Sequence, residues 1–169
     1  MEMPKPDDGV IARRQEIATA LRAIVPGEGV IVDEDALRPY ESDGLTAYKT
    51  LPLIVVLPET TDQVSQVLRY CHENGIKVVP RGAGTSLSGG ALPLADGIIL
   101  GLGKFKKILE IDYDNRCAVV QPGVTNLGIT DAVRDDGFYY APDPSSQIAC
   151  TIRSEEHTSE FQSPDHLVC

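Results

Sequence analysis

The 169-residue sequence is short of positive charge, because 15 Lys and Arg stand against 25 Asp and Glu, for a formal net charge of −10. Nucleic acids and anionic membrane surfaces bind clustered cations, so this balance argues against either as the main partner. No apolar run approaches the roughly 20 residues of a transmembrane helix. The N-terminal residues also lack the apolar segment of a secretory signal. The expected compartment is therefore the cytoplasm.

Cysteine and histidine are scarce as well. The four cysteines form no C-x-x-C pair and match no zinc module, so we expect no metal site. Cys71 and Cys117 fall on a predicted helix and a predicted strand, where they are expected to be reduced, buried and apolar in role. Of the three histidines, His72 lies at the polar end of a helix and is expected to be a surface residue rather than a catalyst.

The first half of the chain alternates between helical and strand patterns. Apolar residues at helical spacing predict a helix over 13–25, and the Pro- and Gly-containing segment 30–50 predicts a loop. The run Leu53–Leu57 predicts a buried strand. Thr60 and Gln63 form a predicted capping box for a helix that ends at Asn74-Gly75. A strand over 76–79 then completes a predicted βαβ unit.

The second half favours antiparallel structure. A strand is predicted over 97–100, followed by a hairpin made of 108–113 and 117–121. A helix is predicted from about Thr125 to Gly137, followed by a proline-stiffened loop over 139–147. Parallel and antiparallel strands with interspersed helices indicate the α+β class.

The segment PRGAGTSLSGG (80–90) holds four glycines and three hydroxyl side chains in eleven residues. Glycine allows φ > 0 and lets a ligand approach the backbone without a Cβ in the way. Successive N–H groups in such a turn form a concave site for anionic oxygens. The predicted ligand is a pyrophosphate, with the charge of Arg81 close by. A plain surface loop is the alternative.

Two common nucleotide-binding loops do not fit this segment. A P-loop needs Lys followed by Ser or Thr after its last glycine, and no such pair is present. The dinucleotide fingerprint G-x-G-x-x-G needs a third glycine where Leu87 stands, and Leu92-Pro93 opens no helix.

Three segments together resemble another family: PRGAGTSLSGGALPL (80–94), VVQPGV (119–124) and YYAPDPSSQIACTI (139–152). They are similar to the FAD-binding domain of flavoproteins related to vanillyl-alcohol oxidase and p-cresol methylhydroxylase. Within that group they most resemble the FAD-containing subunit of bacterial glycolate oxidase. The segments 40–58 and 126–133 share this likeness. The resemblance implies a truncated domain of the p-cresol methylhydroxylase type, with a small parallel βαβ subdomain and the start of an antiparallel subdomain.

The resemblance also implies which residues bind FAD. The expected cofactor-binding residues lie in the glycine-rich loop, at the turn 121–123 and in the proline-flanked segment 142–146. They are Arg81, Gly82, Ala83, Gly84, Thr85, Ser86, Leu87, Gly89, Gly90, Gly123, Pro142, Asp143, Pro144, Ser145 and Ser146. A simple turn before a helix is the alternative for 121–123.

The implied reaction is oxidation of a small D-2-hydroxy acid, glycolate or D-lactate, to the 2-oxo acid with hydride transfer to FAD. The family's base and substrate-binding residues lie in a later domain, so no catalytic residue is assigned here. The implied partners are a second flavin-type subunit and an iron–sulfur subunit, which would bring the protein to the periphery of the inner membrane. The alternative is a non-catalytic nucleotide-binding or interaction module.

The last 17 residues differ in character from the rest. RSEEHTSEFQS (153–163) resembles the translation of a common sequencing adapter, and its acidic and histidine residues have no metal-motif spacing. The expected organisation is an N-terminal helical and loop segment (1–50), a partial FAD-binding domain (51–152), and a non-native tail (153–169) that is disordered or arbitrarily folded.

Overall fold

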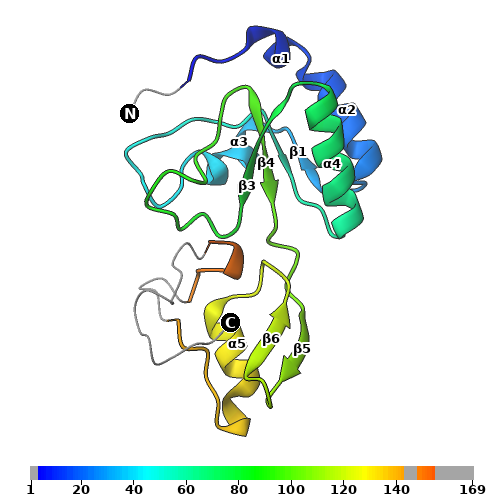
Figure 1. Ribbon diagram of the computed structural model, residues 1–169. Helices are drawn as coiled ribbons and strands as arrows, with labels where there is room; N and C mark the ends of the chain where they lie inside the picture. The colour runs from blue at the N-terminus through cyan, green and yellow to red at the C-terminus, as the bar shows by residue number, and fades with distance from the viewer. Residues whose placement is uncertain (1–3, 143–147, 155–169) are drawn as a thin grey trace.

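The computed structural model describes residues 4–142 and 148–154, which form two lobes joined by the segment 102–107 (Figure 1). The first lobe is a four-stranded sheet with helices on both faces, and the second combines a hairpin with a helix. The first lobe contains α1 (Asp8–Ala12), α2 (Arg14–Ile24), β1 (Val30–Ile31), α3 (Glu34–Leu37), η1 (Arg38–Tyr40), β2 (Ile54–Val56), α4 (Thr61–Glu73), β3 (Lys77–Arg81) and β4 (Gly97–Gly101). The second contains β5 (Ile108–Asp112), β6 (Cys117–Val120), α5 (Asn126–Val133), η2 (Arg134–Asp136) and η3 (Ile152–Ser154).

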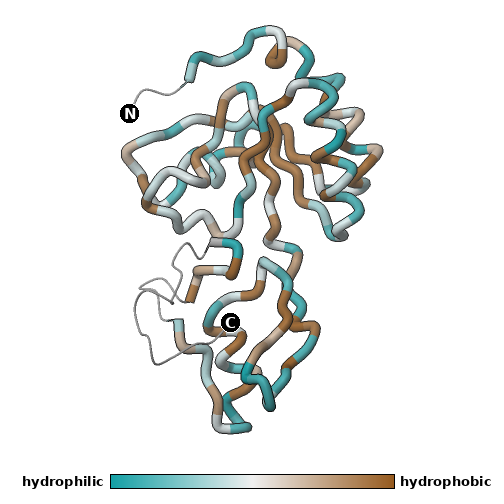
Figure 2. Tube along the Cα trace, in the orientation of Figure 1, coloured by the Kyte–Doolittle hydropathy of each residue, from teal (hydrophilic) through white to brown (hydrophobic). Residues whose placement is uncertain are grey.

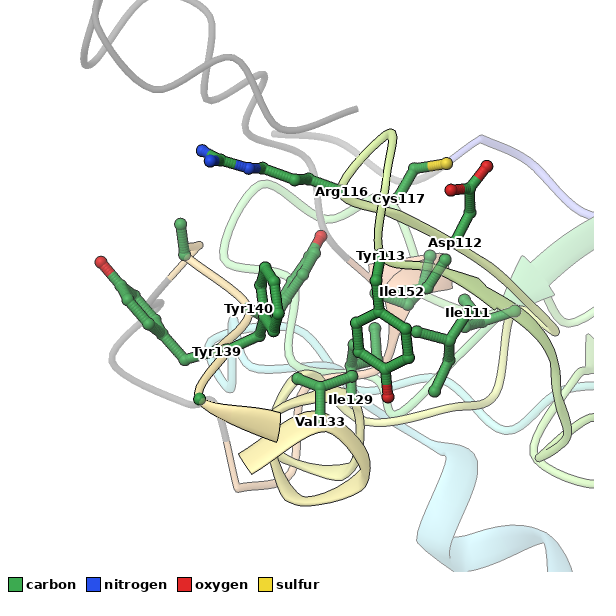
Figure 3. A pocket seen from close by; sticks show the side chains of 15 residues that line it. Ile111, Asp112, Tyr113, Arg116, Cys117, Ile129, Val133, Tyr139, Tyr140 and Ile152 are labelled. Atoms are coloured by element: carbon green, nitrogen blue, oxygen red, sulfur yellow. The ribbon is translucent and has the colours of Figure 1, made fainter. Parts of the chain in front are cut away.

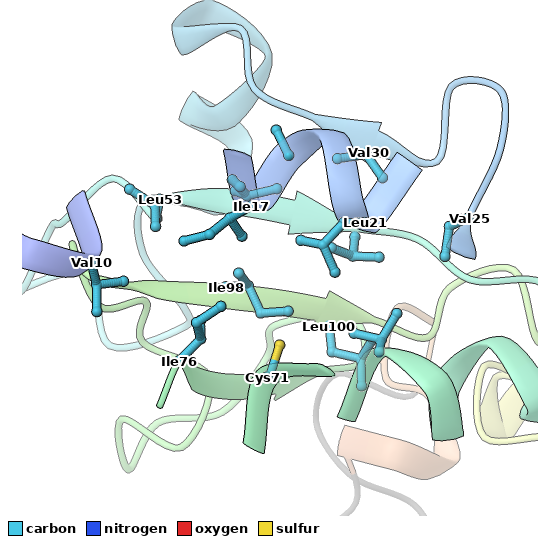
Figure 4. Close-up of a cluster of buried hydrophobic side chains, with 14 residues drawn as sticks. Val10, Ile17, Leu21, Val25, Val30, Leu53, Cys71, Ile76, Ile98 and Leu100 are labelled. Atoms are coloured by element: carbon cyan, nitrogen blue, oxygen red, sulfur yellow. The ribbon is translucent and has the colours of Figure 1, made fainter. Parts of the chain in front are cut away.

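The core of the first lobe follows the alternation of side chains along the strands. Ile98 and Leu100 of β4 point to the face covered by α2 and α4, where they meet Ile17 and Leu21 (Figure 4). Ile99 points to the other face and packs with Leu37 of α3. Both faces of β4 are thus covered, and Figure 2 shows the corresponding hydrophobic centre of the sheet.

Helix α4 begins and ends as the sequence predicts. Gln63 N donates to Thr60 Oγ1 at 3.2 Å. The reciprocal capping-box bond comes one residue earlier than the standard pattern, because Gln63 Oε1 accepts from Glu59 N at 2.7 Å. Gly75 follows the helix with φ +66°, the left-handed conformation that suits glycine.

The predicted βαβ unit is present as β2, α4 and β3, and its two strands are parallel but not adjacent. The sheet order is β1-β2-β4-β3, so β4 lies between β2 and β3 and runs parallel to both. Every residue of β4 is buried, which suits the central position. Strand β3 takes the edge, and its Pro80, which lacks an N–H, is tolerated there.

The segment 30–50 is not all loop. It contains β1, which pairs antiparallel with β2, and the short helices α3 and η1. Asp33 caps α3 by accepting from Ala36 N at 3.1 Å. These elements are too short for hydrophobic periodicity to predict, and tertiary pairing with β2 forms β1.

The second lobe confirms the predicted hairpin and the helix that follows it. Strands β5 and β6 pair antiparallel, with an irregularity between Ile108 and Glu110. Thr125 caps α5 by accepting from Gly128 N at 3.0 Å. Gly137, with φ +81°, ends the following turn. Thr151 forms an isolated antiparallel β-bridge with Thr125, which holds the end of the described chain against the start of α5.

Candidate functional site

The glycine-rich loop leaves the carboxyl end of β3 and returns to the start of β4. Strands β2, β4 and β3 are parallel, so their carboxyl ends meet at one edge of the sheet. Ligands of open α/β sheets bind at that edge, outside the carboxyl ends of the strands. The topology therefore places the loop where a ligand site is expected.

The backbone of this loop turns at two glycines and presents free donors. Gly84 and Gly89 have φ +77° and +80°, which other residues rarely adopt. Among the residues that the structure describes, the four consecutive amides from Gly84 to Leu87 have no hydrogen-bond acceptor. Ser88 N donates to Ser86 Oγ at 3.3 Å, which tightens the turn. Successive free N–H groups of this kind can donate hydrogen bonds to anionic oxygens.

The loop is open to solvent rather than enclosed. Its side chains range from buried (Ser86) to 72% exposed (Leu87). A hollow against it measures about 20 Å³, room for a single water-sized group. The hollow is lined by Pro80, Gly82, Gly84, Ser86, Gly90, Ala91 and Arg153. An extended ligand would therefore lie along the loop surface, with only a small group entering the hollow.

Arg81, which the sequence places beside the pyrophosphate, directs its guanidinium into the protein. The side chain is only 7% exposed. Its Nη1 donates to Ser42 O at 2.8 Å and to Ala91 O at 3.3 Å. Burial lowers the pKa of Arg81, and the nearby Asp43 and Tyr40 oppose that shift. The structure thus gives Arg81 protein partners, and a contact with the cofactor stays a prediction.

The other predicted residues lie apart from the loop or outside the described part. Gly123 is buried against the segment between the lobes: a Cβ there would lie 2.6 Å from both Leu102 O and Phe105 O. This close approach accounts for the glycine by packing alone, so its contact with FAD remains a prediction. Pro142 is half-buried. Asp143, Pro144, Ser145 and Ser146 fall outside the described residues.

A larger hollow of about 380 Å³ lies in the second lobe (Figure 3). It opens between the hairpin and α5 and is mainly apolar, with Ile111, Ile129 and Val133 among its lining residues. The sequence did not predict it. None of the residues of the glycine-rich loop lines it.

Comparison with known proteins decides the kind of ligand. The family model described as FAD binding domain matches residues 52–154, which include the whole glycine-rich loop. The chain belongs to this family of FAD-binding domains. The predicted cofactor, FAD, is therefore confirmed at the level of the family. The loop fits that cofactor because its free amides match the negative charge of the FAD pyrophosphate.

Curated members of the family with similar sequences are oxidoreductases. The glycolate oxidase subunit GlcD of Escherichia coli is 53% identical over 139 residues, covering 82% of this chain and 28% of that protein. The D-lactate dehydrogenase of Archaeoglobus fulgidus is 38% identical over 121 residues, covering 71% of this chain and 27% of that protein. The chain thus spans less than a third of the length of either relative.

Solved structures confirm the predicted fold. p-Cresol methylhydroxylase superposes with a TM-score of 0.66 at 28% identity, covering 79% of this chain and 26% of that one. Alkyldihydroxyacetonephosphate synthase superposes with a TM-score of 0.71, covering 90% of this chain and 29% of that one, and at 20% identity it supports the fold alone. The α+β class and the p-cresol methylhydroxylase type of FAD-binding domain are confirmed.

Neither a membrane-spanning helix nor a metal cluster occurs among the described residues. No helix among them is both long and apolar enough to cross a membrane. Over the same ranges, no three His, Cys, Asp or Glu side chains lie close enough to hold a metal ion. His72 is exposed on α4, as predicted, and Cys71 is buried, but Cys117 is only half-buried because it borders the apolar hollow.

Proposed function

We propose that this chain is part of an FAD-dependent oxidoreductase that oxidises a small D-2-hydroxy acid, and that its glycine-rich loop holds the FAD pyrophosphate. The observation that carries the proposal is the run of four free amides, Gly84 to Leu87, at the carboxyl edge of the parallel strands. The names of the relatives, a glycolate oxidase subunit and a D-lactate dehydrogenase, support the substrate class.

The loop residues bind and orient the cofactor in this proposal. Amides from Gly84 to Leu87 donate to the phosphate oxygens, and the glycines keep side chains out of the approach. Bound there, FAD would supply the acceptor for the hydride that leaves C2 of the hydroxy acid. No catalytic base is assigned within this chain. Gly82, Ala83, Gly89, Gly90 and Pro142 remain proposed contacts around the same cofactor.

Binding can be tested on the 169-residue chain by isothermal titration calorimetry with FAD, ADP and riboflavin. We expect FAD and ADP to bind and riboflavin not to bind, because only the first two carry a pyrophosphate. The variant Gly84→Ala should abolish binding, since its Cβ would lie 2.3 Å from Arg81 Nη2 at φ +77°. Gly75→Ala is the matched control, with similar strain at φ +66° but nothing within 4 Å.

The outcomes separate the alternatives. Binding of FAD and ADP that survives Gly84→Ala would contradict the assignment of the loop. Equal binding of riboflavin would place the flavin ring, rather than the pyrophosphate, at the site. A chain that binds ADP but not FAD would favour the alternative of a non-catalytic nucleotide-binding module.

The oxidation itself can be tested in a chimera. Residues 52–152 of this chain would replace the matching part of the Escherichia coli glycolate oxidase subunit, to which it is similar. We expect a yellow protein that reduces an artificial electron acceptor when given glycolate or D-lactate. A folded but flavin-free chimera would contradict the proposal.

The partners and location follow from the same proposal. We infer assembly with a second flavin-type subunit and an iron–sulfur subunit in the cytoplasm, with peripheral attachment to the inner membrane through those partners. The word subunit in the name of the Escherichia coli relative supports the existence of a complex for that protein. Co-purification of the chimera with the other subunits of that complex tests the contact.

We also propose that residues 153–169 are foreign to the natural protein. The likeness of 153–163 to an adapter translation supports this, although the family match extends to residue 154. Arg153 N donates to Pro122 O at 2.9 Å, so the first residue of this tail lies against the domain. Residues 155–169 lie outside the described part. Resequencing the source DNA across codons 150–155 tests the proposal, and a natural gene that continues into RSEEHTSE would refute it.

A further inference from the structure

The glycine-rich loop rests on a second segment, residues 40–44, that is distant in the sequence. Arg81 joins the two. Its side chain leaves β3 on the face that carries α3 and η1, and its guanidinium carbon lies 5.6 Å from the centre of the Tyr40 ring. The same guanidinium donates to Ser42 O on one side and to Ala91 O, at the end of the loop, on the other. One side chain therefore holds both segments.

The two segments approach so closely that only glycine fits between them. A Cβ at Gly44 would lie 2.8 Å from both Thr85 O and Ser86 O, which is shorter than real Cβ contacts. A Cβ at Gly84 would lie 2.3 Å from Arg81 Nη2, so the loop backbone passes directly over the guanidinium. The backbone that carries the free amides is therefore packed on Arg81 and Gly44.

A buried acidic residue of the same segment, Asp43, acts electrostatically on Arg81. Asp43 is 5% exposed, and its Oδ1 accepts from Leu45 N at 2.9 Å. Its Oδ2 has no hydrogen-bond partner among the described residues. Burial lowers the pKa of Arg81. The negative charge of Asp43 favours the charged form of Arg81 and so limits that decrease. The guanidinium and the Asp43 carboxylate thus attract each other electrostatically, and the guanidinium contacts the segment 40–44 at Ser42 O and at the Tyr40 ring.

We propose that Arg81 is a positioning residue, which with Asp43 and Gly44 holds the loop amides from Gly84 to Leu87 in the arrangement that binds a pyrophosphate. The inference rests on the proposed function of the loop. It differs from the expectation that Arg81 contacts the cofactor directly. Preorganised donors bind more tightly because they lose less conformational entropy on binding.

The first test measures the loop without any ligand, so it does not depend on FAD binding. Backbone ¹⁵N relaxation of the 169-residue chain should give order parameters of about 0.85 for the amides of Gly82, Gly84 and Ser86, as in rigid backbone. In Arg81→Met these values should fall below about 0.6, the range of flexible backbone. Arg81→Lys should fall between, because an ammonium can keep one of the two carbonyl contacts.

Arg38→Met is the matched control. Arg38 lies in the same part of the chain, but its side chain is 59% exposed and pairs with the exposed Glu34 and Asp35. This variant should leave the loop order parameters unchanged. If Arg81→Met does not fold, Gly44→Ala serves instead. Its Cβ would push against Thr85 O and Ser86 O and displace the loop, while Arg81 stays intact.

The second test is titration with FAD. Arg81→Met should weaken binding by about tenfold or more, the lower end of what loss of an outer-shell partner costs at metal sites. Unchanged order parameters in both Arg81→Met and Gly44→Ala would overturn the proposal. Weaker FAD binding with an unchanged loop would also overturn it, and would assign Arg81 to direct contact. Failure of the wild-type chain to bind FAD would count against the proposed function, while the relaxation data would still decide the role of Arg81.

Discussion

The two lobes of this chain bury their apolar residues to very different extents. In the first lobe, Ile54, Val56 and Ile98 are fully buried between helices and neighbouring strands. In the second lobe, Val119 and Tyr139 are 50% and 71% exposed, and an apolar hollow of about 380 Å³ opens between the hairpin and α5. A two-stranded sheet alone is marginally stable in water. The first lobe therefore provides the stable scaffold, and the glycine-rich loop is built on it.

The largest expected difference between the lobes is in thiol reactivity. Cys71, in the first lobe, is 1% exposed, and burial raises its pKa to about 11. At pH 8 about one thiol in a thousand would be ionised, so alkylation of Cys71 should be slow. Cys150 is also buried, at 3%, but lies in the second lobe. We expect Cys150 to react faster than Cys71 because its lobe opens more easily.

Iodoacetamide labelling followed by peptide mass spectrometry measures these two rates. In denaturing urea, Cys71 should react as fast as a solvent-exposed thiol. Equal protection of Cys71 and Cys150 in the native chain would contradict the difference in stability between the lobes.

The next largest effect should come from the core of the first lobe. Ile98→Ala removes a fully buried side chain from β4 and should cost about 2–5 kcal/mol, the range for such truncations. Val119→Ala in β6 is the control and should change stability by less than about 0.5 kcal/mol. Urea denaturation followed by circular dichroism measures both. Similar costs for the two variants would show that the lobes depend equally on their apolar side chains.

A smaller effect is expected at the joint between the lobes. Gly123→Ala would bring a Cβ within 2.6 Å of Leu102 O and Phe105 O, and such overpacking costs about 1–3 kcal/mol. Gly103→Ala lies in the same connecting segment with nothing within 4 Å, so it should be nearly neutral. Thermal unfolding of the two variants gives the comparison. A neutral Gly123→Ala would show that the lobes can separate at this point without cost.

The smallest effect concerns pH and the edge of the first lobe. Asp96 is 2% exposed and accepts from Lys77 Nζ at 2.6 Å and from Asp7 N at 2.9 Å. Burial alone would raise the pKa of Asp96, but these hydrogen bonds outweigh it, so the net pKa lies below the ordinary value of 3.8. The carboxylate therefore stabilises the fold above pH 3.8, and this contribution is lost as pH falls through the lower folded-state pKa.

Asp96→Asn should remove this part of the acid dependence. We expect a change below about 1 kcal/mol, because Lys77 is partly exposed and solvent screens the pair. Urea midpoints between pH 3 and pH 7 measure it, with Asp62→Asn on α4 as the control. An acid dependence that is the same in Asp96→Asn and the wild type would show that the pair contributes nothing to the first lobe.

Local sequence patterns predicted the longer elements correctly. Helical periodicity located α2 and α4, apolar runs located β2 and β4, and turn residues located the hairpin of β5 and β6. These patterns work because each reflects contacts between residues close in the chain. The same local chemistry identified the glycine-rich loop, since positive φ at Gly84 and Gly89 is a property of single residues.

What the sequence patterns did not show involves contacts between distant segments. The insertion of β4 between β2 and β3 is decided by pairing across the sheet, and β1 forms only because Val30 pairs with Val56. The sequence also gave no sign that the Arg81 guanidinium donates to Ser42 O and Ala91 O. The close approach of Gly44 to Thr85 and Ser86 was not predicted either. Gly44 lies in a segment of turns, and nothing in its local sequence predicts that it contacts Thr85 and Ser86, which are 41 and 42 residues away.

The sequence by itself determined the longer helices and strands, the glycine-rich loop that we propose binds an anion, and which family of FAD-binding domains the chain resembles. Helix capping, hydrophobic periodicity and glycine conformation depend on residues close in the chain, so they can be predicted from the sequence. Only the tertiary structure decided the order of the strands and the support beneath the loop. Strand order and the inward turn of the Arg81 guanidinium depend on packing between segments about 40 residues apart, and the one-dimensional pattern does not contain that packing.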